Sequence, residues 1–573
     1  MVEKRWVQKN LPQEEVVNKL SASINVSLPI ATILAQRSIT TYDQARSFFN
    51  PSLSALHDPF LMKDMSKAVA RFAAAIDNGE KILVYGDYDV DGTTSVALFF
   101  GFVNSFYSHC DFYIPDRYSE GYGISKQGVD WAIENEYTLI ISLDCGIRSV
   151  ELITYAKENG VDFIICDHHR PGQILPPAVA VLDPKREDCE YPFKELPGCG
   201  IGFKFMQAIV AHSHVNTDPF EYLDLVAVSV ASDIVPITGE NRILAFSGIQ
   251  KLNTSPRPGL KALMKLAGLQ KNTTITGIVF GLAPRINAAG RISHAKIAVN
   301  LLLAESEEEA YHFAEKLNIK NKKRRDVDSE ITSQALAMIA EDQKLAASKT
   351  TVLFKNDWHK GVIGIVASRC IETYHRPTII LTESNGKATG SARSVPGFDV
   401  HNAIEECSEL LTQFGGHKYA AGLTMELSQI EDFKQRFEEV VSRSIPEELL
   451  VPQVDIDTSL DLDLITPNFL KVLNRMEPFG PENLRPVFAI HRCELVGSSK
   501  VIKEKHLKFT VKQTNGVQKF ETIGFNMAHY SGLLNRGISF NMAASLEENE
   551  YQGVTSIQLT VKDLKFDLDR IEQ

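Results

Sequence analysis

An apolar run that ends in three alternating aspartates constrains this chain more than any other stretch. Residues 82–85 are aliphatic and aromatic, which predicts a short buried strand. Asp87, Asp89 and Asp91 follow at alternate positions, so in an extended or gently turning backbone their carboxylates face one side. Three like charges this close repel one another unless a cation lies between them. The stretch therefore predicts a cation site, with an Asp-rich calcium-type turn or a solvated loop as the alternative.

The residues that follow predict a helix directly after the aspartates. Gly92 permits a sharp turn, Thr93 is a suitable N-cap, and an apolar run at 96–103 comes next. The carboxylates then lie where a strand gives way to a helix. In an open α/β sheet, functional sites are built at that place.

Further along, apolar runs alternate with amphipathic ones, which predicts βαβ units and a parallel sheet. We expect strands at 112–114, 138–143, 161–166 and 178–182, and helices at 65–76, 126–135 and 150–158. Polar side chains follow two of these strands and a buried segment at 223–230, namely Asp144, the pair His168 and His169, and Asp233. Right-handed crossovers bring the carboxyl ends of parallel strands to one edge, so we expect these side chains to meet the three aspartates there.

The residue types at that edge suit hard divalent cations. Aspartates with one or two imidazoles, and without thiolates, favour Mn²⁺ or Mg²⁺ over structural zinc. The set holds more ligands than one ion needs. Two ions roughly 3.5–4 Å apart that share a carboxylate would use them all and would suit phosphoryl chemistry. Taken singly, each residue is more commonly a satisfied core or capping group, but their recurrence at successive segments favours the metal site.

The composition is that of an ordinary globular protein. The 573 residues are 44% hydrophobic and 23% charged, which allows roughly three or four domains, and the net charge is −12. This excess of acid argues against nonspecific polyanion binding over the whole surface but allows a local basic groove. The eight cysteines form no C-x-x-C pair, and no run of ~18 apolar residues occurs. We therefore expect a soluble cytoplasmic protein in a reducing compartment.

The patterns predict an α/β fold in five segments. These are a helical preface at 1–60, a parallel-sheet domain at 61–255, a helical connector at 256–346, a smaller α/β domain at 347–446 and a β-barrel at 447–573. Five short alternating strands between 487 and 561 predict an OB-fold, a common platform for single-stranded nucleic acid. Its aromatic residues are either core or base-stacking groups, and we expect core for most of them: Phe488, Phe509, Phe520, Phe525 and Tyr551.

The connector carries groups suited to nucleic-acid phosphates. Arg285, Asn287 and Arg291 are expected on a glycine-ended loop, where guanidinium forks suit phosphate contacts better than packing. Cations and amides recur at 318–325 on a long helical stretch. This stretch is either a solvated connector helix or a charged face that lines the entry of a strand.

The smaller α/β domain contains a candidate anion pocket. The glycines of 361–364 open a helix, and a helix N-terminus favours an anion. Ser391, Arg393 and the glycine-flanked His417 belong to two further glycine-rich stretches. Together they predict a pocket that receives a nucleic-acid phosphate, with a plain turn as the alternative for His417.

Four motifs at the predicted sheet edge resemble those of the DHH phosphoesterase superfamily: D-Y-D-V-D-G (87–92), L-D-C-G (143–146), D-H-H (167–169) and A-S-D-I-V-P (231–236). The stretches W-H-K-G-V-I-G (358–364), G-S-A-R (390–393) and G-G-H-K-Y-A-A-G (415–422) resemble the DHH-associated domain. The similarity is closest to the RecJ family of bacterial single-strand-specific 5′→3′ exonucleases. It includes R-Y-S-E-G-Y-G (117–123), A-P-R-I-N-A-A-G-R (283–291) and E-P-F-G-P-E-N (477–483).

This resemblance implies roles for individual residues. One ion would be held by Asp89 and Asp144, and the other by Asp91, Asp144, His168 and Asp233, with Asp87 in the same acidic cluster. His169 would face the scissile phosphate. Ser391 and Arg393 would grip a terminal 5′-phosphate and His417 would stabilise the phosphate being cleaved, with Arg117 or Arg291 as alternative anchors.

The resemblance also implies an activity. We expect a monomeric enzyme with two Mn²⁺ or Mg²⁺ ions that releases 5′-mononucleotides from single-stranded DNA in repair and recombination, fed by a helicase and a single-strand-binding protein. We further expect a cleft between two lobes that admits one strand. The alternatives are a non-catalytic scaffold on a decayed DHH domain and a small DHH enzyme acting on pyrophosphate, oligoribonucleotides or cyclic dinucleotides.

Overall fold

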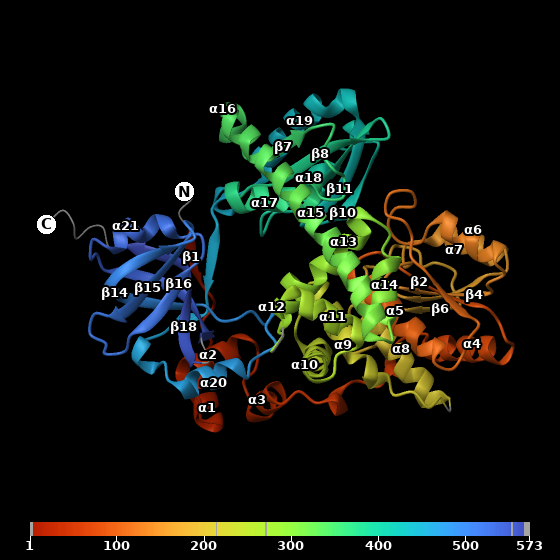
Figure 1. Cartoon of the computed structure of the whole chain (residues 1–573), viewed down its shortest axis with the longest axis horizontal. Helices are drawn as coiled ribbons and strands as arrows, with labels where there is room; N and C mark the ends of the chain where they lie inside the picture. Colours follow the sequence, from red (N-terminus) through yellow and green to blue (C-terminus); the bar gives the residue numbers. More distant parts are fainter. Residues whose placement is uncertain (1–3, 214, 270–271, 552–553, 567–573) are drawn as a thin grey trace. The chain divides into compact units, whose positions relative to one another are not determined.

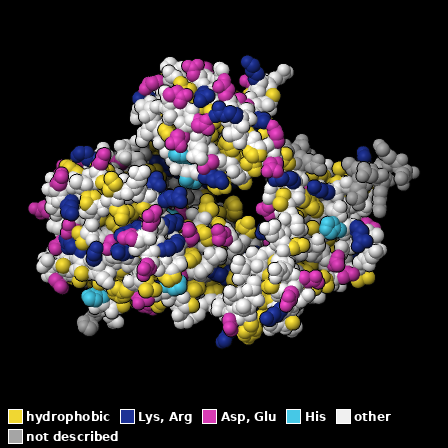
Figure 2. All heavy atoms as spheres, turned by 180° about the vertical axis from the view of Figure 1, so that it is seen from behind, with side chains coloured by type: hydrophobic (Ala, Val, Ile, Leu, Met, Phe, Trp, Pro, Cys, Tyr) yellow, Lys and Arg dark blue, Asp and Glu magenta, His cyan; other side chains and the backbone are white. Residues whose placement is uncertain are grey.

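The computed structural model describes residues 4–213, 215–269, 272–551 and 554–566. The chain divides into two compact units, which we describe separately (Figure 1). The larger unit contains Trp6–Ala283, Leu302–Glu305 and the chain from Gln453 onward, and the smaller contains Pro284–Leu301 and Ser306–Pro452. Basic and acidic side chains intermingle over the face of the molecule that Figure 2 shows.

A five-stranded parallel sheet in the order β3-β2-β4-β5-β6 forms the centre of the first domain. Its strands are β2 (Ile82–Gly86), β3 (Cys110–Tyr113), β4 (Leu139–Leu143), β5 (Asp162–Cys166) and β6 (Ala180–Leu182). The register pairs Gly86 with Leu143, Leu143 with Cys166, and Cys166 with Leu182. Four strands therefore end in one row, as the alternating pattern predicted.

Helices cover both faces of this sheet. The helices of this domain are α4 (Met65–Asp77), α5 (Val90–Asn104), α6 (Lys126–Glu134), α7 (Val150–Glu158), α8 (Gly198–His212), α9 (Leu223–Ser232), α10 (Gly239–Thr254), α11 (Pro258–Ala267) and α12 (Ile275–Gly277), followed by a π-helical turn (Ile278–Leu282). One face packs against α6 and α7 through a core that includes Leu83, Ile140 and Phe163. The other packs against α4, α5 and α8 (Figure 1).

One local prediction in this domain was wrong. The helix after the aspartates begins at Val90 rather than near Val96, and its N-cap is Asp89, not Thr93, because the Asp89 carboxylate accepts a hydrogen bond from the Gly92 amide at 3.0 Å. The buried segment before Asp233, for which the sequence analysis left helix or strand open, is helix α9. A short, wholly apolar run carries no periodicity that distinguishes a buried helix from a buried strand.

The N-terminal helices belong to the core of the C-terminal domain. Helices α1 (Glu14–Ile24), α2 (Leu28–Gln36) and α3 (Tyr42–Phe49) share one cluster of buried side chains with the barrel, and β1 (Arg5–Gln8) pairs with β12 (Gln453–Ile456). Among the described residues no single helix has the length and apolar composition of a membrane span. The bent pair α1 and α2 meets that test together, and its Leu20, Ile33 and Leu34 are buried in this core.

The C-terminal domain is a closed barrel. Its strands lie in the order β14 (Phe488–Ile502), β15 (His506–Gln513), β16 (Phe520–Gly524), β18 (Val554–Phe566) and β17 (Phe540–Tyr551). The barrel closes because β17 also pairs with β14. The flanking elements are β13 (Thr458–Ser459), α20 (Pro467–Asn474) and α21 (Ser531–Leu534). The pairing of β16 with β18 is parallel. This is the predicted OB-fold. Phe488, Phe509 and Phe520 are core, Phe525 is 54% exposed, and the Tyr551 side chain lies outside the described part of the chain.

The smaller unit is a mixed sheet with helices on both faces. Its strands follow the order β10-β11-β9-β8-β7, with bounds β7 (Thr351–Phe354), β8 (Thr378–Ser384), β9 (Lys387–Arg393), β10 (Gln413–His417) and β11 (Ala420–Glu426). The helices are α13 (Ala283–Ile292), α14 (Lys296–Leu303), the long α15 (Glu307–Glu341), α16 (Gln343–Ala347), α17 (Ile363–Tyr374), α18 (Val400–Glu405) and α19 (Ile430–Ser444). The cluster around Val366 packs α15 and α17 on one face, and the cluster around Phe437 packs α18 and α19 on the other.

The predicted loop of Arg285, Asn287 and Arg291 is helix α13 instead. Ile286, Ala288 and Ala289 are fully buried, so packing of the small side chains maintains the helix through Gly290. Tertiary contacts here override the weak helix propensity of glycine.

Candidate metal centre

Four carboxylates lie in one row at the carboxyl edge of the parallel sheet. The residues that directly follow the aligned ends of β2, β4, β5 and β6 are Asp87, Asp144, Asp167 and Asp183. All four are buried. Burial and the nearby carboxylates raise the pKa of Asp87 and Asp144 well above the ordinary range of an aspartate, and the pKa of Asp183 rises to about 7 chiefly because of burial.

Asp91 lies opposite this row and is held by the first turn of α8. The Gly198 and Cys199 amides donate to its carboxylate at 2.6 and 2.9 Å, and the Ser229 hydroxyl donates at 2.6 Å. Backbone amides at a helix N-terminus stabilise an anion. Gly198 is required here because a Cβ atom at that position would lie 2.6 Å from the Asp144 Cβ.

The imidazole of His168 joins these two groups of carboxylates. Its Nε2 lies 3.2 Å from Asp144, 3.4 Å from Asp233 and 3.8 Å from Asp91. Burial lowers the pKa of His168 to about 4, which favours the neutral form that ligates metals. Asp233, at the end of α9, thus joins the site as predicted, and burial together with Asp91 raises the pKa of Asp233 well above its usual range.

The cluster fits divalent cations. At this edge of the sheet, six buried carboxylate and imidazole atoms find no hydrogen-bond partner among the described residues: Asp87 Oδ2, Asp144 Oδ1, Asp183 Oδ2, Asp233 Oδ2, and both ring nitrogens of His168. Two ligand groups have atoms mutually within 4.8 Å, namely Asp144 with His168 and His169, and Asp91 with His168 and Asp233. A buried polar atom without a hydrogen-bond partner destabilises the folded protein unless a ligand such as a metal ion or a water molecule binds it. Oxygen donors with imidazole nitrogen suit Mn²⁺ or Mg²⁺.

Asp89 lies at the start of the same helix. It is the N-cap of α5, and burial and the charge of Asp91 raise the pKa of Asp89. The three aspartates that opened the sequence argument are therefore together at this edge, with Asp87 after a strand and Asp91 in the first turn of a helix.

His169 is oriented by Asp167, a residue for which the sequence argument assigned no role. The His169 Nδ1 lies 2.7 Å from Asp167 Oδ1, and its Nε2 lies 3.2 Å from the Tyr122 hydroxyl. Burial alone would lower the pKa of His169, but the hydrogen bond with Asp167 raises it, and the same bond holds the pKa of Asp167 below the usual range against the effect of burial. The position of Asp167 directly after β5 was a signal that could have identified it.

Arg117 and two tyrosines flank the acidic cluster. The Arg117 guanidinium lies 5.0 Å from the centre of the Tyr88 ring, and Tyr88 meets Tyr122 edge-on at 6.1 Å. The charge of Arg117 also acts on Asp87, whose carboxylate accepts a hydrogen bond from the Gly123 amide at 3.4 Å. The stretch 117–123 therefore lies beside the candidate metal ligands.

In the smaller unit, the predicted anion-binding residues lie on one face of the sheet. The register places Arg393, Ala420 and His417 in one row across β9, β11 and β10, and directly opposed residues share a face. The Arg393 Nη1 donates to Ser391 Oγ at 3.0 Å. A Cβ atom at Gly364 would lie 2.8 Å from Arg393 Nη2 and 2.9 Å from Ser391 Oγ, so the first turn of α17 lies directly against these side chains.

The connector arginines occupy separate positions on α13. Arg285 donates to Asn318 on α15 at 3.1 Å, and Arg291 donates to the Gly361 carbonyl at 3.1 Å. Asn287 is partly buried on the same helix. Arg291 thus touches the glycine-rich segment before α17, whereas Arg285 lies nearer the cationic stretch of α15, where burial and Arg325 lower its pKa.

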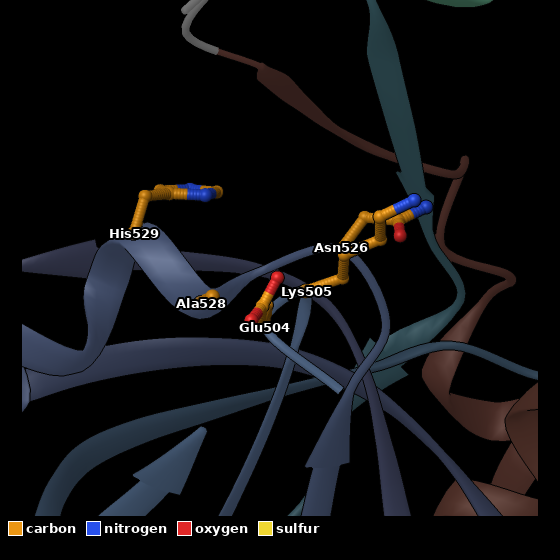
Figure 3. Close-up of a pocket in the computed structure, with 5 residues that line it drawn as sticks. All are labelled: Glu504, Lys505, Asn526, Ala528 and His529. Carbon is orange, nitrogen blue, oxygen red and sulfur yellow. The ribbon is translucent and has the colours of Figure 1, made fainter. Parts of the chain in front are cut away.

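A pocket of about 310 Å³ lies in the barrel and not at the acidic cluster (Figure 3). Glu504, Lys505, Asn526, Ala528 and His529 line it. A carboxylate stands beside an ammonium group there, so the lining lacks the single sign of charge that a phosphate site requires. We assign it no role in catalysis.

Comparison with known proteins agrees with this geometry. Three family models match: the DHH family N-terminal domain at 81–230, the DHHA1 domain at 342–443 and the RecJ OB domain at 456–563. The chain is 36% identical over 566 residues to the single-stranded-DNA-specific exonuclease RecJ of Bacillus subtilis, covering 98% of this chain and 70% of the relative. This chain belongs to the RecJ family. It is also 32% identical to RecJ of Escherichia coli, over 88% of this chain and 90% of that one.

Solved structures of the RecJ family have the same fold. RecJ of Thermus thermophilus in complex with Mn²⁺ superimposes with a TM-score of 0.84 at 27% identity, covering 98% of this chain and 79% of that one. The same protein in complex with Mg²⁺ gives 0.78 at 25% identity, covering 98% of this chain and 78% of that one. The predicted family and fold class are thereby confirmed. The cofactors of the RecJ family are divalent cations of the predicted kind, and the cluster described above fits them.

Proposed function

We propose that this chain is a single-strand-specific 5′→3′ exodeoxyribonuclease that releases 5′-mononucleotides by two-metal hydrolysis. The observation that carries the proposal is the cluster of carboxylates around His168, in which Asp144, Asp233 and His168 each have a buried atom without a hydrogen-bond partner among the described residues. Membership of the RecJ family, whose named relatives act on single-stranded DNA, supports the choice of substrate. A role in DNA repair and recombination follows from the same membership.

The metal ligands in this proposal are Asp89 and Asp144 for one ion, and Asp91, Asp144, His168 and Asp233 for the other, with Asp87 completing the acidic cluster. When bound, two such ions activate water and neutralise charge on the phosphate undergoing displacement. Other residues of the chain hold two side chains of this site, Asp91 and His169, in place. The amides of α8 fix the Asp91 carboxylate, and Asp167 fixes the ring of His169.

His169 is the residue we assign to the scissile phosphate. The hydrogen bond with Asp167 raises the pKa of His169, which favours its protonated form. A charged donor there stabilises negative charge that develops on the phosphate in the transition state. In this structure the His169 Nε2 contacts the Tyr122 hydroxyl at 3.2 Å, and a bound phosphate would replace or share that contact.

Ser391, Arg393 and His417 are the residues of the smaller unit that we assign to the DNA phosphates. Their common sheet face, the contact of Arg393 with Ser391, and the glycine at 364 support this assignment. Arg117, Arg285, Asn287 and Arg291 are proposed as further contacts to the strand. A planar guanidinium binds phosphate oxygens through two parallel hydrogen bonds, which suits a terminal 5′-phosphate.

We also propose a cytoplasmic, monomeric enzyme that receives its strand from a helicase and a single-strand-binding protein. All eight cysteines are free and buried, which suits a reducing compartment. The competing proposal is a non-catalytic scaffold, in which metal ligands would have been lost. The presence of every carboxylate and imidazole of the cluster favours the enzyme.

The test compares three substrates with the full chain and Mn²⁺. We expect mononucleotides from single-stranded DNA, little product from blunt duplex, and little from a cyclic dinucleotide. Asp144→Ala should abolish hydrolysis because it removes the carboxylate shared by both ions. The proposal is refuted if the folded, metal-loaded chain prefers the dinucleotide, digests from the 3′ end or cuts no phosphodiester.

A further inference from the structure

The loop that follows Asp233 is strained. Ile234 is a β-branched residue with φ of 59°, and its side chain is 78% exposed although it is large and apolar. A β-branched residue in the left-handed region is a steric outlier that persists only where the surroundings hold it. The loop therefore needs support from outside itself, and its position determines where the Asp233 carboxylate lies.

That support comes from the segment 477–483 of the C-terminal domain, which we call the brace. The Ile237 amide donates to the Pro481 carbonyl at 2.8 Å, and the Ile237 side chain is fully buried. A Cβ atom at Gly480 would lie 2.5 Å from Ile237 Cγ1, so the brace packs directly against the end of the loop and leaves no room for a larger residue. Nothing in the proposed catalytic function explains the E-P-F-G-P-E-N stretch, but this contact does.

The brace is itself fixed from three sides. Asn483 is buried, and its Nδ2 donates to the carbonyls of Met476 and Pro478 at 3.0 and 2.7 Å. Arg37, at the end of α2, donates to Asn483 Oδ1 at 2.5 Å. From α10, the buried Arg242 donates to the carbonyls of Met476 and Glu477 at 2.9 and 2.8 Å.

A second residue connects the same loop to the other side of the cluster. Asn241 is fully buried and donates through Nδ2 to the carbonyls of Pro236 and Glu195, at 3.1 and 2.5 Å. Glu195 precedes Gly198, whose amide holds Asp91. Asn241 therefore contacts both the Asp233 loop and the segment that leads to Gly198. The brace packs against the same loop from the C-terminal domain.

We propose that the brace is a positioning element for the metal centre, through which the C-terminal domain sets the affinity of the Asp233 site for its cation. This rests on the assignment of Asp233 as a metal ligand under the proposed function. Groups that orient a ligand change metal affinity about 10- to 100-fold when they are altered. The brace residues touch neither cation nor substrate and act by fixing the loop.

The test is calorimetric titration of the metal-free full chain with Mn²⁺. The site that includes Asp233 is identified as the one whose Mn²⁺ binding is lost in Asp233→Asn. Gly480→Ala should raise the Kd of that site for Mn²⁺ by about tenfold, because the new methyl group displaces Ile237. Gly524→Ala is the matched control, since its Cβ would also be crowded, at 2.9 Å from Met527 Sδ, but inside the barrel and away from the loop. Gly524→Ala should lose about as much thermal stability as Gly480→Ala, but its Kd for Mn²⁺ should equal that of the wild type.

A rescue and a milder variant complete the experiment. Ile237→Ala removes the atom that the Gly480→Ala methyl meets, so the double variant should bind Mn²⁺ more tightly than Gly480→Ala alone. Arg37→Met loosens the brace without crowding the loop, and it should raise the Kd in the same direction even if Gly480→Ala fails to fold. Wild-type Mn²⁺ affinity in both Arg37→Met and any folded Gly480→Ala sample would overturn the proposal that the brace positions the metal centre. Wild-type affinity in Asp233→Asn would instead overturn the assignment of Asp233 as a metal ligand.

Discussion

His169 shows how one neighbour sets the chemistry of a single residue. Its pKa is raised by Asp167 despite partial burial, and the two side chains form a 2.7 Å contact. The pair resembles the carboxylate–histidine arrangements that fix a ring and its proton. The proton on His169 is therefore a property of the pair.

Asp167→Asn should lower the pKa of His169 toward or below its ordinary value, because the carboxylate that favours the imidazolium is gone while burial remains. Single-turnover cleavage at neutral pH should slow by roughly ten- to a hundredfold. The measurement is an NMR titration of labelled histidines in the metal-free chain, together with the single-turnover rate. Asp183→Asn removes a carboxylate one strand further along and should leave most of the shift in place; an unshifted His169 in Asp167→Asn contradicts this account.

Arg393 is the residue on which the polarity of the reaction depends. Arg393→Ala should erase the advantage of a 5′-phosphate over a 5′-hydroxyl end, a loss of roughly ten- to a hundredfold for a charge-assisted contact of about 1.5–3 kcal/mol. The assay maps products from oligonucleotides with either 5′ terminus. Arg436→Ala, which removes a partly buried arginine of the same domain paired with Glu409, is the control. If the mutant keeps its end preference, Arg117 or Arg291 is the anchor.

Helix α8 supports the site through its first turn. Its first turn donates two amides to Asp91, and its first residue packs against Asp144. These two amides lie at the positive end of the helix dipole, a place where backbone N–H groups bind anions. Displacement of this helix end would therefore move ligands of both ions.

Gly198→Ala should weaken Mn²⁺ binding by at least about tenfold, because its methyl group would lie 2.8 Å from the Asp144 Cα and cannot be accommodated by a side-chain rotation. Gly202→Ala, one turn further along the helix, meets the tip of Leu143 at 3.0 Å, and a methyl tip can turn away. Titration with Mn²⁺ and thermal unfolding of both variants provide the comparison. Equal affinities for the two would show that α8 does not position the ligands.

For the molecule as a whole, the acidic cluster links metal binding to stability. The folded state raises the pKa of Asp87, Asp144 and Asp233, so in the absence of metal it binds more protons than the unfolded chain does. The metal-free protein should therefore lose stability as pH rises above the ordinary aspartate range, since stability falls wherever the folded state holds the extra protons. Cations replace those protons and remove the penalty.

The difference in unfolding temperature between samples with Mn²⁺ and with EDTA should accordingly grow from pH 5 to pH 8. At a hundredfold excess over Kd the metal contributes about 2.7 kcal/mol, or roughly 5 to 10 °C for a domain of this size. Thermal scans at four pH values measure it. Asp144→Asn should flatten the dependence, and a difference that shrinks with rising pH would contradict the linkage.

Much of this fold was predictable because its patterns are local. The apolar runs of β2, β4 and β5 end in charged residues, and parallel pairing aligns strand ends regardless of what lies between them. That is sufficient to bring Asp87, Asp144 and His168 together. The alternating strands of the barrel were predicted for the same reason, since a period of two is visible without any knowledge of partners.

Only the tertiary structure decided the features that depend on distant contacts. Asp233 reaches the site from the end of a helix, Asp91 is held by amides of residues 198 and 199, and the helix carrying Arg285 forms through buried small side chains. The support of the Asp233 loop by Pro481 joins residues more than two hundred positions apart. Local patterns encode which face of a segment is buried, but the partner of that face is selected by packing of the whole chain, which no short stretch contains.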